Sequence, residues 1–128
     1  MKNLIAICVL LIIGLGCKNK DAHPQSTLTF KDVDVATANK MIAENSDLVI
    51  LDVRTPEETE LGIIPNAVVI DYNAPDFDAK LSILKKSTPY LVYCRSGVRS
   101  VGASNKMIAA GFTDVTNMKG GYNAWMEK

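Results

Sequence analysis

Blocks of apolar residues along this chain predict strands and helices in turn. Residues 48–53 and 89–93 are nearly continuous apolar runs, a pattern typical of strands that are covered on both faces. Residues 34–45 instead carry apolar side chains at helical spacing, and they begin at Asp34, a residue type that often caps helices. Further strands are expected at residues 28–30, 67–71 and 113–118, and further helices at residues 55–60, 76–86, 101–110 and from residue 122.

The alternation of strands and helices favours an α/β fold. A chain of this kind builds a mostly parallel sheet, here of about five strands, with helices on both faces. The 128 residues leave room for a single domain with one core. Because ligands of parallel sheets bind beyond the carboxyl ends of the strands, the residues that follow the run at 89–93 are candidates for the functional site.

The first residues follow a different pattern, which is typical of an export signal. A basic residue, Lys2, precedes an apolar run over residues 4–16, so residues 1–16 are predicted to be a signal peptide. The run is shorter than the ~20 residues that a membrane-spanning helix needs. Residues 17–26 are polar, so we expect them to form a flexible tether ahead of a folded domain over residues 27–128.

The end of the predicted signal resembles the lipobox of bacterial lipoproteins, in which a small residue precedes a lipidated cysteine. Gly16 before Cys17 fits this pattern. Gly14 and Leu15 depart from its usual order, so ordinary signal cleavage is the alternative. A lipid on Cys17 implies a domain that is exported from the cytoplasm and anchored to a membrane of the cell envelope, where it faces the periplasm or the exterior.

The charge balance and the positions of the histidine and the cysteines disfavour several classes of function. The 14 basic residues balance the 14 acidic ones, which gives no electrostatic case for a nucleic-acid partner. The only histidine, His23, lies in the predicted tether, which disfavours a Cys-His catalytic pair and a histidine-based metal site. Cys8 lies in the predicted signal peptide and Cys17 is the predicted lipidation site, so Cys94 is the only thiol of the predicted domain and no disulfide framework is expected.

Cys94 stands between the predicted strand at residues 89–93 and the helix that follows. A thiol at the start of a helix is usually reactive, because backbone N–H groups and the helix dipole stabilise the thiolate. The alternative is a small buried hydrophobe. Gly97 allows backbone angles that a side chain hinders. Arg95 and Arg99 offer positive charge to an anionic substrate, unless they are ordinary solvated side chains.

Four separate stretches carry a resemblance to a known family. They are residues 51–58 (LDVRTPEE), residues 62–67 (GIIPNA), the loop from Cys94 to Ser100, and residues 119–121 together with Trp125. With these stretches in this order, the chain resembles a single-domain rhodanese. Ile63 and Asn66 stand where this family usually has a histidine and often a glycine. The resemblance implies a three-layer α/β fold and a reaction that needs no cofactor and no metal.

The resemblance also implies a sulfurtransferase. Cys94 would take the outer sulfur of thiosulfate or a related small anion and hold it as a persulfide. A thiophile would then remove the sulfur: cyanide in the test tube, and a thiol or a partner protein in the cell. Asp52 and Arg54 are expected to support the loop through charge-assisted hydrogen bonds rather than to act as catalytic acid and base. The domain is expected to be a monomer. The expected substrate-binding residues are Arg95, Ser96, Gly97, Val98, Arg99 and Ser100.

Two other functions are compatible with a reactive thiol. A cysteine phosphatase or arsenate reductase also uses a thiolate in a backbone cradle. Cysteine phosphatases, however, have a longer spacing between cysteine and arginine than the four residues that separate Cys94 from Arg99. The shorter ring favours a sulfur atom over a phosphate. The second alternative is a persulfide carrier or redox-sensing module without enzymatic activity.

Overall fold

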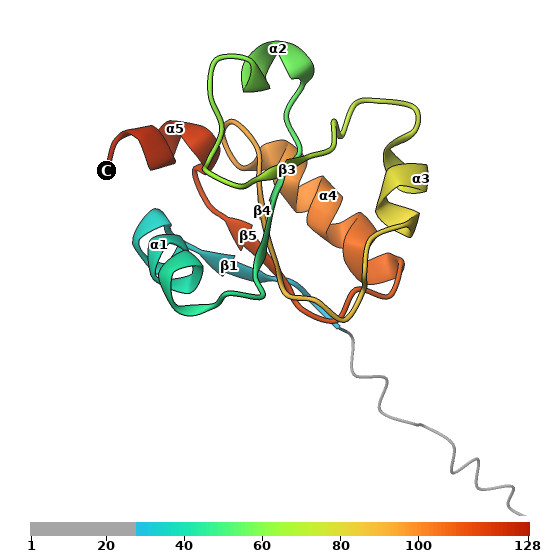
Figure 1. Ribbon diagram of the computed structural model, residues 1–128. Coiled ribbons are helices and arrows are strands. Elements are labelled where there is room, and N and C mark those ends of the chain that lie inside the picture. The colour runs from blue at the N-terminus through green and yellow to red at the C-terminus, as the bar shows by residue number, and fades with distance from the viewer. Residues whose placement is uncertain (1–27) are drawn as a thin grey trace, which may run out of the picture.

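A computed structural model describes residues 28–128, and it confirms the α/β fold (Figure 1). Five strands form one sheet in the order β1-β5-β4-β2-β3, and every neighbouring pair is parallel. The strands are β1 (Lys31–Val33), β2 (Val49–Asp52), β3 (Val68–Val69), β4 (Tyr90–Tyr93) and β5 (Val115–Met118). The predicted signal peptide and tether, including Cys17, lie outside the described residues.

Helices cover both faces of the sheet. They are α1 (Val35–Glu44), α2 (Pro56–Thr59), α3 (Phe77–Ser82), α4 (Val98–Ala109) and α5 (Gly121–Met126). Figure 1 shows α1 and α5 on one side of the sheet and α3 and α4 on the other. One core cluster accordingly joins Ala38 of α1 to Leu91 of β4, and the second joins Met107 of α4 to Val92 of β4. Among residues 28–128, no helix has both the length and the apolar character that crossing a bilayer requires.

β4 is the central strand, and its position decides where the reactive loop lies. All four of its residues are buried, because β5 and β2 flank it and helices cover both of its faces. Its side chains point alternately to the two core clusters, which explains why its apolar run is continuous rather than alternating. The strand ends at Tyr93, so Cys94 lies at the middle of the carboxyl edge of the sheet.

Several elements differ in extent from the expectation; β3, for example, covers only Val68–Val69 of the expected residues 67–71. β1 occupies Lys31–Val33 rather than residues 28–30, and α3 ends at Ser82 rather than at residue 86. The extent of β1 follows from its pairing with β5, which places Lys31 opposite Thr116. Beyond α3, the carbonyl of Lys85 accepts a hydrogen bond from the Tyr90 hydroxyl at 2.8 Å. The residues between α3 and β4 therefore form a connecting segment that is tied to the start of β4, instead of a further helical turn.

Candidate active site

Cys94 begins a short loop that leads directly into α4. Gly97 closes the loop as the N-cap of α4, with a φ of 102° that side chains rarely adopt. α4 therefore begins at Val98 rather than at the expected residue 101. As a result, Arg99 and Ser100 lie in the first turn of the helix, close to the thiol, instead of in an extended loop.

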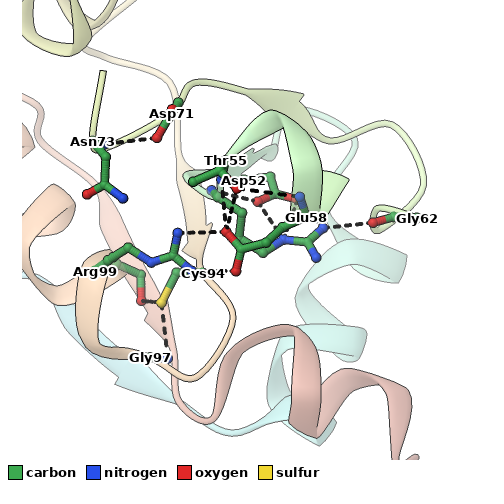
Figure 2. A network of polar contacts seen from close by, with 11 residues as sticks. Asp52, Thr55, Glu58, Gly62, Asp71, Asn73, Cys94, Gly97 and Arg99 are labelled. Atoms are coloured by element: carbon green, nitrogen blue, oxygen red, sulfur yellow. Dashed lines mark hydrogen bonds and ion pairs between the residues drawn. The ribbon is translucent and has the colours of Figure 1, made fainter. Parts of the chain in front are cut away.

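The thiol of Cys94 is buried and lies among hydrogen-bond donors (Figure 2). Its Sγ is 3.1 Å from the main-chain nitrogen of Gly97 and 3.4 Å from the Ser100 hydroxyl oxygen. Burial raises the pKa of this thiol, but the Ser100 hydroxyl and the main-chain N–H groups of Ser100, Gly97 and Ser96 lower it by more. The pKa of Cys94 therefore lies below its ordinary value, which favours the nucleophilic thiolate.

Alkylation of Cys94 is expected to reach half of its maximal rate at a lower pH than alkylation of an ordinary thiol. The lowered pKa keeps the thiolate populated as the pH falls, and only the thiolate reacts. The measurement is iodoacetamide labelling at Cys94, located by peptide mapping, over a range of pH. In the urea-unfolded chain the midpoint should return to about 8.5, and equal midpoints in the two states would contradict the lowered pKa.

The same pKa difference links the thiolate to folding stability. Because the pKa of Cys94 is lower in the folded chain, the hydrogen bonds to its thiolate add stability fully above the unfolded-state pKa. That contribution is lost as the pH falls through the folded-state pKa. The thiolate form of Cys94 and the folded form of the chain thus favour each other most strongly at pH values above the unfolded-state pKa.

Arg99 forms an ion pair with Glu58 of α2 (Figure 2). Its two terminal nitrogens each lie 2.7 Å from a carboxylate oxygen of Glu58. The hydrogen bonds from Arg99 are the main cause that lowers the pKa of Glu58 to about 2. The same carboxylate accepts a hydrogen bond from the main chain of Thr55 and completes the capping box of α2. Much of the positive charge of Arg99 is therefore balanced within the protein.

Asp52 and Arg54 form a buried ion pair at the carboxyl end of β2. Arg54 Nη2 donates to an Asp52 carboxylate oxygen at 2.7 Å and to the Gly62 carbonyl at 2.8 Å. The guanidinium carbon of Arg54 also lies 4.0 Å from the centre of the Tyr122 ring. The pair thereby joins β2 to the segment after α2 and to α5.

α5 holds the Cys94 loop in place from the other side. The main-chain N–H of Tyr122 donates to the Cys94 carbonyl at 2.8 Å. The N–H of Asn123 donates to the Arg95 carbonyl at 3.0 Å. This approach requires Gly121, because a Cβ atom at that position would lie 2.7 Å from the carbonyl carbon of Arg95. Gly121 also has a φ of 59°, which side chains disfavour.

A hollow of about 330 Å³ lies between the Cys94 loop, α2 and α5. Charged side chains of Glu57, Glu58 and Arg95 line it, and Leu61 and Tyr122 add apolar surface. Cys94 does not belong to its lining and is only 1% exposed. A substrate in the hollow would therefore have to extend beyond these lining residues to reach the thiol.

The expected substrate-binding residues thus take different positions at one edge of the sheet. Gly97 and Ser100 contact Sγ, Ser96 contributes its main-chain N–H, Arg95 lines the hollow, Arg99 pairs with Glu58, and Val98 points away with 78% of its surface exposed. Sequence reasoning did not assign Glu57, Glu58 or Gly121 to the site. The only signal for them was their place within the stretches that carry the family resemblance.

Comparisons with known proteins agree with this geometry. Residues 34–128 match the family model of the rhodanese-like domain. A sulfurtransferase from Allochromatium vinosum is 31% identical over 94 residues, which cover 73% of this chain and 86% of the relative. Thiosulfate sulfurtransferase GlpE from Pseudoalteromonas translucida is 29% identical over 99 residues, which cover 77% of this chain and 90% of that protein.

A solved structure gives the same result. The crystal structure of a rhodanese-like domain protein from Staphylococcus aureus superposes with a TM-score of 0.68 at 33% sequence identity. The match covers 75% of this chain and 91% of that protein. Sequence, fold and the cysteine loop at the end of β4 agree, and the chain therefore belongs to the rhodanese-like domain family, which includes sulfurtransferases.

Proposed function

We propose that this protein moves a sulfane sulfur from thiosulfate or a related donor to a thiol, through a persulfide on Cys94. The observation that carries the proposal is the set of donors around the Cys94 Sγ, which stabilises negative charge on a single sulfur atom. The similarity to a thiosulfate sulfurtransferase supports the choice of donor. The expected cellular acceptor is a thiol, with cyanide as its substitute in the test tube.

In the first half-reaction, the Cys94 thiolate attacks the outer sulfur of thiosulfate. A sulfur–sulfur bond forms at Sγ, the sulfur–sulfur bond of thiosulfate breaks, and its electron pair leaves with sulfite. The negative charge then lies on the outer sulfur of the persulfide. Main-chain N–H groups of the Cys94 loop stabilise this charge as they stabilise the thiolate.

In the second half-reaction, an acceptor thiolate attacks the outer sulfur of the persulfide. The bond between Cys94 Sγ and the outer sulfur breaks, and its electron pair returns to Sγ. The Cys94 thiolate is thereby regenerated within the same set of donors. Two half-reactions through one covalent intermediate predict ping-pong kinetics.

A phosphatase is the rival reaction for the same nucleophile. Phosphate transfer to a cysteine requires an arginine whose fork of N–H groups binds the phosphate oxygens. Arg99 instead donates one hydrogen bond from each terminal nitrogen to the Glu58 carboxylate. This ion pair supports transfer of a sulfur atom over transfer of a phosphate.

Mass spectrometry after incubation with thiosulfate tests the proposal. We expect an increase by the mass of one sulfur atom on Cys94, and cyanide should remove that sulfur as thiocyanate. A parallel incubation with an aryl phosphate should give no hydrolysis. Hydrolysis of the ester without a sulfur adduct would establish the phosphatase alternative. A persulfide that forms but supports no repeated turnover would establish the carrier or sensor alternative.

We further propose that the domain is exported and held at a membrane of the cell envelope by a lipid on Cys17. The pattern of residues 1–16 supports this proposal. The residues of the site described above all lie between Asp52 and Asn123. A chain that lacks residues 1–26 should therefore leave the membrane fraction and keep its full sulfurtransferase activity. Cys17→Ser is the matched variant, and loss of activity in the shortened chain would place part of the site in the tether.

A further inference from the structure

We propose that Arg95 and Glu57 select a free amino-acid thiol, with one ammonium and one carboxylate group, as the sulfur acceptor. This inference rests on the proposed function and names the class of its second substrate. Glu57 would bind the ammonium group, Arg95 would bind the carboxylate, and the thiol on its short methylene arm would reach Cys94.

The charged side chains that line the hollow are only partly paired within the protein. Four charged side chains border it, two basic and two acidic. Arg54 is bound to Asp52, and Glu58 is bound to Arg99. Among residues 28–128, neither Arg95 nor Glu57 forms a salt bridge. The hollow therefore presents one cation and one anion to a ligand.

The placement of these two side chains supports the proposal. Glu57 belongs to α2, whereas Arg95 belongs to the Cys94 loop, so the opposite charges come from different walls of one hollow. A doubly negative anion such as thiosulfate is attracted by Arg95 but repelled by Glu57. A zwitterion is attracted by both side chains, because its carboxylate can pair with Arg95 and its ammonium group with Glu57.

The depth of the thiol also supports the proposal. Cys94 is only 1% exposed, so the incoming sulfur must project from the body of the acceptor. A thiol on a methylene group has this shape. Leu61, which is 90% exposed, and the ring of Tyr122 line the hollow and offer apolar surface to that methylene. The hollow of about 330 Å³ lies at the lower end of the size range of small-molecule sites.

The transfer step balances without a further reactant. The acceptor thiolate forms a bond to the outer sulfur of the Cys94 persulfide, and the bond from that sulfur to Cys94 Sγ breaks. The products are the persulfide of the acceptor and the Cys94 thiolate. The sulfane sulfur keeps its oxidation state, so no external oxidant or reductant takes part.

Three small thiols on the full-length protein test the proposal. Cysteine carries both charged groups, 3-mercaptopropionate lacks the ammonium, and cysteamine lacks the carboxylate. The protein is first loaded with sulfur from thiosulfate, and the loss of the persulfide is followed by mass spectrometry in a single turnover. Rates are compared at equal thiolate concentration, because the three thiols ionise differently. We expect cysteine to react about threefold to fivefold faster than either analogue, the size of effect that one exposed ion pair gives.

Two variants assign the preference to the two side chains. Glu57→Gln should remove the advantage of cysteine over 3-mercaptopropionate, and Arg95→Gln should remove its advantage over cysteamine. Glu60→Gln, an exposed acidic residue just beyond α2, is the control and should leave both ratios unchanged.

The outcomes separate this inference from the proposed function. If the persulfide forms and all three thiols remove it equally fast, the inference is wrong and the proposed function stands. If Glu60→Gln changes the ratios as much as Glu57→Gln, general surface charge explains them and the inference is also wrong. If thiosulfate produces no persulfide on Cys94, the proposed function fails and this inference fails with it.

Discussion

Replacing Cys94 with serine is expected to reduce sulfur transfer from thiosulfate to cyanide to the uncatalysed background. A serine hydroxyl does not ionise near neutral pH, and its oxygen cannot form the sulfur–sulfur bond on which the proposed reaction depends. The smaller polar side chain can still accept a hydrogen bond from the Gly97 main chain, so the fold should persist. The measurement is thiocyanate production, with urea denaturation of the same sample to verify folding.

Ser100→Ala provides a graded comparison at the same site. This change removes one donor to the Cys94 thiolate but leaves the main-chain donors of the loop in place. The pKa of Cys94 should rise and the transfer rate should fall by about tenfold, the effect of one hydrogen bond to a charged group. Turnover that survives in Cys94→Ser would show that a different nucleophile carries the reaction.

Gly121→Ala is expected to lower both stability and activity, although the residue contacts no substrate. The added Cβ would meet the main chain of Cys94 and Arg95, and the φ of 59° disfavours any side chain. Strain and overpacking together should lower the free energy of unfolding by about 3 kcal/mol. Displacement of the loop by a fraction of an ångström to an ångström should lower kcat/KM by up to about 100-fold. Urea denaturation and thiocyanate production measure the two effects.

Gly111→Ala distinguishes the effect of backbone strain from the effect of the steric clash that a Cβ at position 121 would cause. Gly111 also has a positive φ, of 95°, but a Cβ there would meet only the Lys86 side chain, at the ordinary contact distance of 3.8 Å. The variant should lose about 1 kcal/mol of stability through strain alone and should keep its activity. Equal losses of stability and activity in the two variants would mean that the close contact between α5 and the Cys94 loop contributes nothing to the effect of Gly121→Ala.

The central strands were predictable from the sequence because burial on both faces leaves a direct mark on composition. β2 and β4 are such strands, and their apolar runs coincide closely with their bounds. The edge strands leave no such mark. β3 has only two residues, Val68 and Val69, and both are about 40% exposed. The extent of an edge strand depends on its single neighbour, which the local pattern does not contain.

The candidate site was predictable as far as its residues are neighbours in the chain. Cys94, Gly97 and Ser100 lie within seven consecutive residues. Asp52 and Arg54 were expected to support the loop, but the ion pair between them was not predicted. Glu58 was missed because its partner Arg99 is 41 positions away. The early start of α4 was missed because the left-handed Gly97 caps the helix without a side-chain hydrogen bond, so it provides none of the usual capping signals.

The use of main-chain donors around Sγ has a consequence for how this protein can change over evolutionary time. The N–H groups of Ser96, Gly97 and Ser100 exist whatever side chains surround them, whereas the side chains of Arg95, Ser96 and Val98 face solvent. Mutations at the exposed positions can alter which molecules dock while the nucleophile keeps its reactivity. Under the proposed function, partner choice and sulfur chemistry would thus depend on different atoms of the same short loop, so that a lineage could lose or gain a partner without passing through an inactive ancestor.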